Sequence, residues 1–280
     1  MSSTTINIAV IDLYNNEVNQ GMRCIKDLLH EFDCRYKNIS VQYKVYDARY
    51  KDEIPSDKYD VYISSGGPGS PFEGEGSAWE KKYFELIDKI WNHNQKNSTG
   101  KKYIFFICHS FQLMARHFKF GEVTKRNSKS FGVMPVHKTE DGLNESILKG
   151  LPVPFYGADF RDFQVVQPNK KVIDEFGARI IALEKIRPHI ALERAIMGVR
   201  ISNEIVGTQF HPEADPASMY YHFRQPERKE HVVSNYGEEK YFEMLRLLEE
   251  PMSIPLTRKT VIPNFLTNAI KELRPEESSE

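Results

Sequence analysis

The sequence predicts an α/β protein whose core is a doubly wound, mostly parallel sheet. Short apolar runs alternate with segments that repeat apolar residues at helical spacing throughout the N-terminal half. Several of these runs end in polar or glycine-rich segments, which are typical of loops. The chain has 280 residues, of which 40% are hydrophobic, and this is sufficient for a full core. Alternating strands and helices form parallel βαβ units, so a functional site is expected at the carboxyl ends of the strands.

The N-terminal half supplies the parallel part of the predicted sheet. Residues 6–13 form an apolar run typical of a buried strand. Residues 17–32 place Val18 and five further apolar residues at helical spacing, which predicts the first helix. Further strands are predicted at 41–46, 61–63 and 103–107, and further helices at 78–93 and 111–118.

Residues 132–209 break this alternation and predict an antiparallel excursion from the parallel sheet. Short strand-like segments lie at 133–137, 163–166, 180–183, 195–199 and 205–209. The last of them is expected to return the chain to the carboxyl edge of the parallel strands, where the predicted site lies.

The C-terminal part predicts a helical extension. We divide the chain into a catalytic domain, residues 1–214, and an extension, residues 215–280. Helical spacing or start signals occur at 216–223, 237–248 and 263–273, and the tail 274–280 is expected to fray. These helices are expected to cover the chain's own apolar surface, although they could instead cover the site or bind a partner.

Composition and charge exclude several classes of protein. The formal net charge is −1, so no bulk electrostatic attraction to nucleic acid or to a membrane is expected. Three cysteines make a poor disulfide framework, no signal-peptide pattern is visible, and no apolar run approaches the roughly 20 residues that span a bilayer. A cytoplasmic protein is therefore expected. Metal-ligand spacings and phosphate-binding glycine loops are missing from the sequence, so neither a metal nor a cofactor is predicted.

Two distant segments carry the chemistry. Cys108 follows the apolar run 103–107 and precedes a helical segment, so its thiol is expected on a sharp strand-to-helix turn. A helix N-terminus favours negative charge, which promotes the reactive thiolate. Some hundred positions later, His211 and Glu213 follow the strand 205–209 in the segment Phe-His-Pro-Glu. Side chains at i and i+2 of an extended segment share a face, so this carboxylate can orient the imidazole.

A glycine-rich loop follows the strand 61–63. It contains Gly66 and Gly67, whose missing Cβ atoms would let backbone amides approach a developing oxyanion. Each feature alone has a structural explanation, namely a buried cysteine, a turn, and a strand end with a satisfied histidine. Their coincidence at three strand ends favours a common site.

Together these segments resemble the class I (triad-type) glutamine amidotransferases, in particular the GMP-synthase-like glutaminase domain. The resemblance implies a flavodoxin-like fold, with Cys108 as nucleophile, His211 as general base and acid, and Glu213 as the orienting carboxylate. It further implies an oxyanion hole formed by the Gly66–Gly67 loop and the backbone amide of His109. Gln112, which follows the elbow as in the family, would belong to the substrate-binding set.

The chain departs from the family pattern at two places. The family has glycine two residues before and two residues after the cysteine, where this chain has Phe106 and Ser110. Ser110 is small enough to be tolerated, whereas Phe106 requires either a shifted strand or smaller neighbours. A Ser-His pair that helps to hold glutamine in the family is replaced by a loosely aligned Asp159-Phe160.

The resemblance predicts a glutaminase that releases ammonia for an acceptor handled by a separate synthase. Two alternatives remain. One is a hydrolase of the same fold that cleaves a γ-glutamyl or other amide, which product analysis with a panel of amides would distinguish. The other is a catalytically silent scaffold for a partner, which a normal thiol pKa and no labelling by glutamine-like electrophiles would favour.

Overall fold

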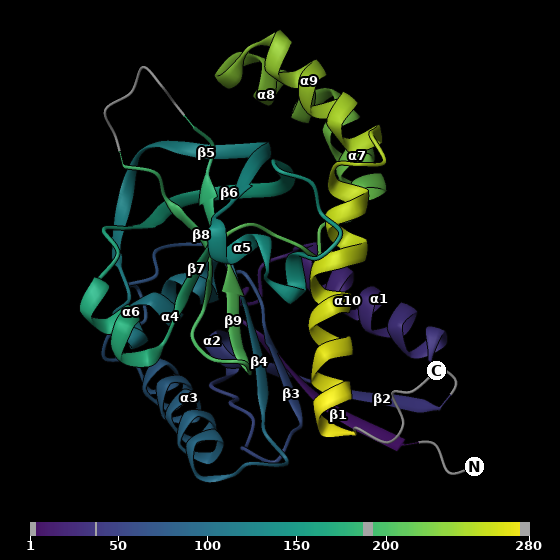
Figure 1. Cartoon of the computed structure of the whole chain (residues 1–280). Helices are drawn as coiled ribbons and strands as arrows, with labels where there is room; N and C mark the ends of the chain where they lie inside the picture. Colours follow the sequence, from purple (N-terminus) through teal and green to yellow (C-terminus); the bar gives the residue numbers. More distant parts are fainter. Residues whose placement is uncertain (1–3, 37, 187–192, 275–280) are drawn as a thin grey trace.

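A computed structural model describes residues 4–36, 38–186 and 193–274 (Figure 1). Within these residues one nine-stranded sheet has the order β2-β1-β3-β4-β9-β8-β7-β5-β6. The first five strands in this order are parallel and the remaining four pair antiparallel. The strands are β1 (Thr4–Asp12), β2 (Ile39–Asp47), β3 (Val61–Ser64), β4 (Tyr103–Ile107), β5 (Glu122–Lys138), β6 (Phe155–Val166), β7 (Arg179–Glu184), β8 (Ile196–Arg200) and β9 (Ile205–Thr208).

The predicted fold class is confirmed, including the doubly wound parallel part and the antiparallel excursion. The parallel order β2-β1-β3-β4-β9 is that of flavodoxin-like sheets, which bind ligands at the carboxyl ends of their strands. β9 joins the two parts, because it pairs parallel with β4 and antiparallel with β8. The loops after β1, β3, β4 and β9 therefore open at one edge of the sheet.

Helices cover both faces of the parallel strands. Alternation along β1 sends Ile6, Ile8 and Val10 into one core, and Ala9 and Ile11 into the other. The first core contains α1 (Gly21–Arg35), and the second contains α3 (Ala78–Lys96) and α4 (His109–Phe118). Shorter helical elements are α2 (Ala48–Lys51), α5 (Glu140–Leu143), η1 (Ser146–Leu148) and α6 (Lys170–Phe176).

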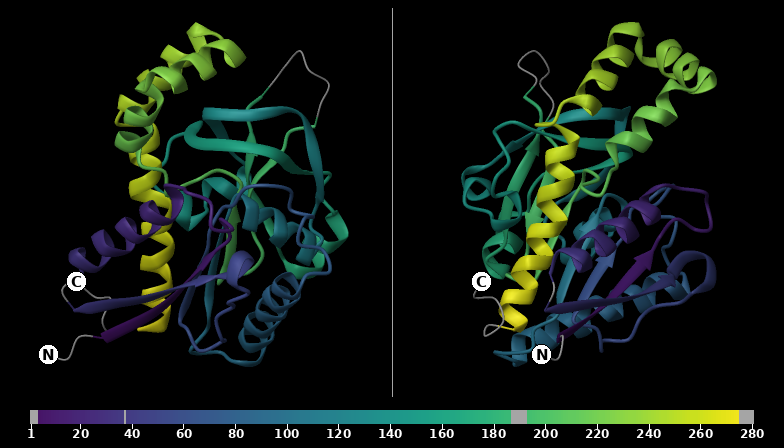
Figure 2. Two further views of the ribbon diagram at one scale, coloured as in Figure 1. Left: turned by 180° about the vertical axis from the view of Figure 1, so that it is seen from behind. Right: turned by 90° about the vertical axis from the view of Figure 1, so that its right-hand side faces the viewer.

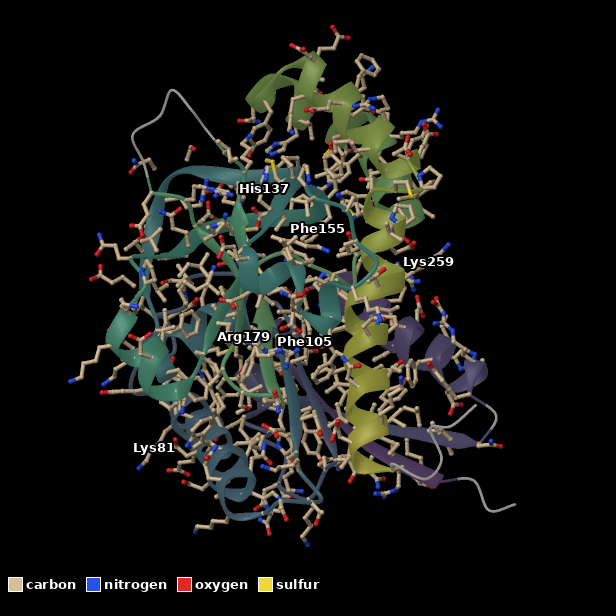
Figure 3. All side chains as sticks on the ribbon, in the orientation of Figure 1. Lys81, Phe105, His137, Phe155, Arg179 and Lys259 are labelled. Carbon is tan, nitrogen blue, oxygen red and sulfur yellow. The ribbon has the colours of Figure 1, made fainter. Side chains whose placement is uncertain are left out.

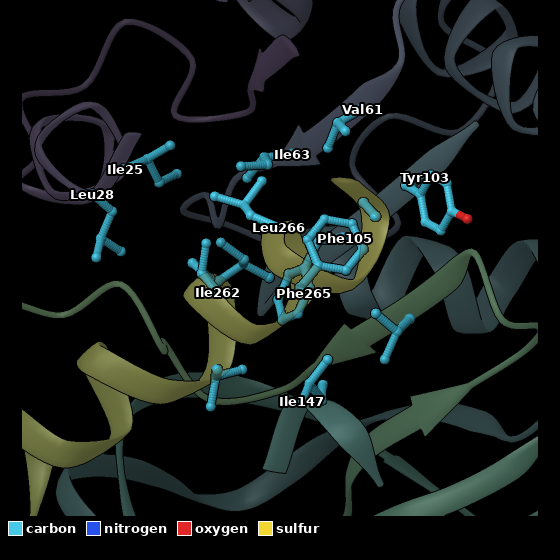
Figure 4. Close-up of a cluster of buried hydrophobic side chains, with 14 of the residues drawn as sticks. Ile25, Leu28, Val61, Ile63, Tyr103, Phe105, Ile147, Ile262, Phe265 and Leu266 are labelled. Atoms are coloured by element: carbon cyan, nitrogen blue, oxygen red, sulfur yellow. The ribbon is translucent and has the colours of Figure 1, made fainter. Parts of the chain in front are cut away.

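Four C-terminal helices follow β9, namely α7 (Pro216–Arg224), α8 (Pro226–Tyr236), α9 (Glu238–Glu249) and α10 (Ile254–Leu273). The long α10 runs lengthwise beside the sheet, whereas α7, α8 and α9 form an arm beyond its antiparallel end (Figure 2). The Phe265 ring of α10 meets the Phe105 ring of β4 at a centroid distance of 5.2 Å, deep in the first core (Figure 4). The arm packs on β5 and β6 in a third cluster that includes Val133, Phe223 and Met244.

Many apolar side chains of these elements lie in the cores, and many charged side chains lie at the surface. Phe105 and Phe155 are buried, whereas Lys81 of α3 and Lys259 of α10 are exposed (Figure 3). Thr257 of α10 also donates a 2.6 Å hydrogen bond to the Tyr156 carbonyl oxygen, so α10 is tied to β6 as well as to the core.

Three sequence-based expectations differ from the structure. Val18, expected to face inward from a helix, is fully exposed in a loop, because α1 begins only at Gly21. A turn from Tyr14 to Glu17, closed by a 3.0 Å backbone hydrogen bond, precedes this loop, and residues 17–20, the predicted first helical turn, are not helical. Pro263, expected to begin a helix, lies inside α10, whose buried residues extend on both sides of it. The strand predicted at 133–137 is the end of the longer β5. Of the tail expected to fray, only Arg274 lies among the described residues.

Candidate active site

Cys108 lies on a strained turn between β4 and α4. Its backbone has φ 49° and ψ −98°, a conformation that non-glycine residues rarely adopt and that often marks functional sites. The Cys108 amide donates to the Thr208 carbonyl oxygen of β9 at 2.8 Å, and its own carbonyl oxygen accepts from the Gln112 amide at 3.1 Å. Backbone hydrogen bonds to the neighbouring strand β9 and to the first turn of α4 thus fix the conformation of this turn.

The segment after β9 brings His211 and Glu213 to the same edge of the sheet. The register pairs Ile107 with Thr208, so β4 and β9 end side by side. The His211 amide donates to the Ala158 carbonyl oxygen at 2.8 Å, which fixes the backbone there. His211 Nδ1 lies 2.7 Å from Glu213 Oε1, and Glu213 is only 1% exposed. This is the predicted pairing of imidazole and carboxylate.

Electrostatics favour a protonated His211. Burial opposes a charge on the ring, but the Glu213 carboxylate and the Cys108 thiol, with a hydrogen bond to each, together hold the pKa of His211 well above its usual value. His109 behaves in the opposite way. Burial, together with the nearby Arg49 and Arg116 guanidinium groups, lowers the pKa of His109 to about 3, so its imidazole stays neutral.

Two glutamine side chains support the thiol. Gln209 Nε2 donates to Cys108 Sγ at 3.6 Å. Gln112 Nε2 in turn lies 3.2 Å from Gln209 Oε1 and 3.3 Å from the Phe163 carbonyl oxygen. Gln112, predicted to bind substrate, is thus 3% exposed and hydrogen-bonded within the protein. Gln209 was not singled out from the sequence, although it directly precedes the Phe-His-Pro-Glu segment.

The glycine loop lies against the imidazole. A Cβ atom at Gly66 would stand 2.8 Å from His211 Cε1, and one at Gly67 would collide with the Leu13 carbonyl oxygen. Space rather than backbone conformation therefore requires glycine at both positions. Arg49 fixes the loop, because it donates to the carbonyl oxygens of Leu13 at 3.0 Å and Pro68 at 2.7 Å. The structure thus brings the loop that contains Gly66 and Gly67 to His211.

The two departures at the elbow have structural explanations. The buried Ser110 hydroxyl accepts from the Ile107 amide at 2.7 Å and lies 2.8 Å from the Ser64 carbonyl oxygen, so it connects the elbow to β3. Phe106 keeps regular register with both neighbouring strands, because its partner on β9 is Gly207. A smaller neighbour, rather than a shifted strand, makes room for the ring.

The segment aligned with the family's Ser-His pair also reaches the site. The Asp159 carboxylate is buried and accepts from Ser130 Oγ at 2.6 Å and from Arg161 Nε at 2.9 Å. The hydrogen-bond partners of this carboxylate therefore lie on β5 and β6, the strand pair that contains it. The adjacent Phe160 ring faces His211, with 6.4 Å between the ring centroids.

A cavity of about 680 Å³ opens beside these residues. His211, Glu213 and Gly67 contribute to its wall, whereas Cys108, which is 4% exposed, does not. Two further wall residues, Tyr14 and Cys24, were not predicted from the sequence. Burial raises the pKa of Tyr14 and raises that of Cys24 to about 11, and the Glu213 charge acts in the same direction on both. Both side chains therefore remain protonated at neutral pH.

No group of three or more histidine, cysteine, aspartate or glutamate side chains within 4–36, 38–186 and 193–274 is arranged to hold a metal ion. In the same residues, no helix has the length and apolar character needed to cross a bilayer.

The family model for the class I glutamine amidotransferases matches residues 22–224 of the chain. The comparison with curated proteins gives no match. Among solved structures, a glutamine amidotransferase from Thermotoga maritima is 18% identical with a TM-score of 0.63, covering 95% of this chain and 98% of its own. A candidate GMP synthase subunit from Thermoplasma acidophilum is 20% identical with a TM-score of 0.50, covering 75% and 85%. The glutaminase domain of Trypanosoma brucei CTPS, with bound acivicin, is 13% identical with a TM-score of 0.58, covering 95% and 94%. At these identities the similarity to solved structures is one of fold.

Proposed function

Because the chain belongs to the class I glutamine amidotransferase family, we propose that it hydrolyses the side-chain amide of glutamine through a thioester on Cys108. The observation that supports this proposal most strongly is the position of Cys108. It lies on a turn with positive φ, beside His211, whose Nδ1 atom lies 2.7 Å from Glu213 Oε1. A thiol, a base and an orienting carboxylate in this order form the catalytic unit of cysteine-dependent acyl transfer.

The proposed first step is attack of the Cys108 thiolate on the amide carbon. The raised pKa of His211 keeps a proton on the imidazole, and this proton goes to the departing nitrogen as the carbon–nitrogen bond breaks. The backbone amides of Gly67 and His109 are proposed to stabilise the tetrahedral oxyanion. Glu213 keeps the ring oriented, and Gln209 steadies the thiol through its 3.6 Å contact.

The second step returns the enzyme to its starting state. His211, now neutral, takes a proton from water, which attacks the thioester carbon and releases glutamate and the thiolate. The overall balance is one glutamine and one water in, one glutamate and one ammonia out. A reducing compartment such as the cytoplasm would preserve Cys108 and the exposed Cys34 as the thiols seen in the structure.

The proposed acceptor of the ammonia is a separate synthase. This is supported by two similar folds, one described as a glutaminase domain of CTPS and the other as a candidate GMP synthase subunit. We propose residues 1–214 as the catalytic unit and residues 215–280 as an extension that completes its surroundings. The extension contributes to the core through Phe265 and to the cavity wall through Met219 and Phe223.

The test is the release of glutamate and ammonia from glutamine by purified protein. Cys108→Ala is expected to reduce turnover by at least about 10⁴-fold without unfolding the chain, since the nucleophile is lost. Cys34→Ala is the matched control, because this exposed thiol lies in α1 outside the cavity wall, and it is expected to retain full activity. A substantially active Cys108→Ala protein would contradict the proposed mechanism.

A further inference from the structure

A second cavity, of about 750 Å³, lies at the edge of the sheet opposite Cys108. Its wall includes Tyr103, the first residue of β4, and Glu204, which directly precedes β9, whereas Cys108 follows the carboxyl end of β4. The helix α10 contributes Asn268 and two charged residues to the same wall. Pockets of roughly 300–1,000 Å³ hold small organic ligands. This cavity therefore has room for such a ligand, and it is separate from the proposed cysteine chemistry.

Hydrogen bonds hold α10 at this edge of the sheet. Asn268 Nδ2 donates to Ser146 Oγ at 2.9 Å. One turn earlier, Asn264 Nδ2 donates to the carbonyl oxygens of Ser146 at 3.2 Å and Lys149 at 3.1 Å. Ser146 belongs to η1 and also contributes to the cavity wall. The wall groups on α10 are thus tied to the wall groups that precede and follow the strands.

The Tyr103 hydroxyl is an unused hydrogen-bonding group of this wall. Tyr103 is only 4% exposed, and its ring belongs to the first core. The hydroxyl oxygen points away from the Phe105 ring (Figure 4), and no described residue forms a hydrogen bond with it. Burial, together with the charges of Glu204 and Glu272, raises the pKa of Tyr103, so the hydroxyl keeps its proton. A buried hydroxyl without a partner is unfavourable, so a ligand gains by supplying that partner.

Four of the seven charged groups in the wall pair with one another. Arg200 donates to the two oxygens of Glu145, at 2.6 Å and 2.7 Å. Lys101 Nζ lies 3.7 Å from Glu204 Oε1 and donates to the Asn94 carbonyl oxygen at 2.6 Å. These two cations and two carboxylates therefore compensate one another within the protein.

Three charged groups of the wall remain available to a ligand, namely Arg179, Lys271 and Glu272. The Arg179 side chain is 41% exposed and lies 3.8 Å from Glu145 Oε2, a carboxylate that Arg200 already holds. Lys271 and Glu272 form no hydrogen bond or ion pair with any described residue. The available set is thus two cations and one carboxylate. A complementary ligand carries two carboxylates and one ammonium group.

The available groups are spread along the edge of the sheet. The Glu272 charge acts on Tyr103, which begins β4, whereas Arg179 begins β7. The strands β9 and β8 lie between β4 and β7, so three spacings of about 4.8 Å, or roughly 14 Å, separate the two backbones. The side chains shorten the gap between the charged groups. A peptide of three residues, which reaches roughly 10 Å, fits this span better than a single amino acid does.

We propose that this second cavity binds a short acidic peptide that carries one ammonium group and two carboxylates. Glu272 and the Tyr103 hydroxyl receive the ammonium group, Arg179 binds one carboxylate, and Lys271 binds the other. The site goes beyond the proposed function and does not depend on it. Because the peptide contacts both α10 and the sheet, its binding stabilises the docked position of α10.

Calorimetric titration of the purified protein tests the three charges of the ligand. The probe is Ala-Glu-Ala, and the comparison peptides are Ala-Gln-Ala, N-acetyl-Ala-Glu-Ala and Ala-Glu-Ala amide, each of which lacks one charge. Ala-Glu-Ala is expected to bind about 10-fold or more tightly than each comparison peptide, because each loses a charge-assisted contact. No binding of Ala-Glu-Ala, or equal affinity for any comparison peptide, would overturn the proposal. Cys108→Ala is expected to bind Ala-Glu-Ala as the unaltered protein does, so failure of the cysteine chemistry would leave this result unchanged.

Variants of the wall test where the peptide binds. Glu272→Gln is expected to weaken binding of Ala-Glu-Ala by about 10-fold and to leave that of the N-acetyl peptide unchanged, since only the former has the ammonium group. Arg179→Gln should weaken binding of both peptides. Tyr103→Phe keeps the ring in the core and should weaken binding of Ala-Glu-Ala.

Lys259→Gln is the matched control, because Lys259 lies on α10, is exposed and is absent from the cavity wall. It is expected to retain full affinity for Ala-Glu-Ala. Equal affinity in Glu272→Gln, Arg179→Gln and Lys259→Gln would overturn the assignment of the peptide to this cavity. Circular dichroism identifies any loss of fold, and the exposed Glu272→Gln keeps the test valid if Tyr103→Phe unfolds.

Discussion

Phe106 of β4 lies directly beside Gly207 of β9, and a Cβ atom at position 207 would stand 2.9 Å from the Phe106 Cβ. The same atom would lie 3.0 Å from the Phe111 ring and 3.1 Å from the Met114 sulfur. Phe106 thus occupies the position where the family has a glycine, and Gly207 on the neighbouring strand leaves the space that the larger side chain needs. As a result, Cys108 retains the strained turn and the backbone bond to Thr208.

This relationship predicts the effect of Gly207→Ala. The added methyl group has no space, so the free energy of unfolding is expected to fall by about 1–3 kcal/mol, the usual cost of overpacking a core. Denaturant titration would measure the loss. In the double variant Phe106→Gly/Gly207→Ala, the alanine at 207 is expected to cost less than it does opposite Phe106, because the Phe106 Cβ atom that it would meet is removed. Equal costs in the two backgrounds would contradict the proposed compensation.

Glu213→Gln is expected to alter the pH dependence of hydrolysis. The Glu213 charge raises the pKa of His211, so its removal lowers that pKa. Because the reaction needs a protonated imidazole to expel the amine, activity is lost as the pH rises through the pKa of His211. The alkaline limb of the kcat/KM profile should therefore move to lower pH. The loss at the optimum should be smaller than that of Cys108→Ala, since the imidazole remains.

A matched histidine–carboxylate pair outside the site provides the control. His117 Nε2 lies 3.2 Å from Asp88 Oδ1, and the Asp88 charge raises the pKa of His117 against the effect of burial. Asp88→Asn is expected to leave the kcat/KM profile unchanged. An unchanged alkaline limb in Glu213→Gln, or an equal shift in Asp88→Asn, would show that His211 is not the group that sets this limb.

Phe265→Ala tests whether α10 is part of the core. The Phe265 ring is 2% exposed and meets Phe105 at 5.2 Å, so its truncation is expected to cost about 3–5 kcal/mol of unfolding free energy. Lys259→Ala on the exposed side of the same helix should change stability by no more than about 0.5 kcal/mol. Denaturant midpoints of the two variants would be compared, and similar values would mean that α10 is only loosely docked.

The sequence was informative where one short segment determines one structural feature. The run 103–107 followed by Cys108 predicted the strand and the turn, and the extended segment from His211 to Glu213 predicted the 2.7 Å pairing, because both are local. The alternation of elements likewise predicted the doubly wound parallel sheet, whereas its flavodoxin-like character was implied by the family resemblance.

Features that depend on contacts between distant segments could not be predicted in this way. Gln209 and Tyr14 acquire their places only when the ends of β9 and β1 meet beside Cys108. The wall of the cavity beside His211 combines Phe131 with Phe223, which are far apart in the chain. Val18 was misplaced for a related reason. Its spacing fits a helix, but the chain forms a turn before α1.

The most direct test of the central claim is labelling by a glutamine-like diazoketone electrophile, followed by intact mass measurement and peptide mapping. Cys108 is expected to carry the adduct selectively, with protection by glutamine, whereas Cys24 should not react because burial raises its pKa to about 11. Cys108→Ala should remain unlabelled. A protein whose Cys108 reacts with a small general thiol reagent but not with the diazoketone would contradict the claim, since it would have an accessible thiol without a working glutamyl site.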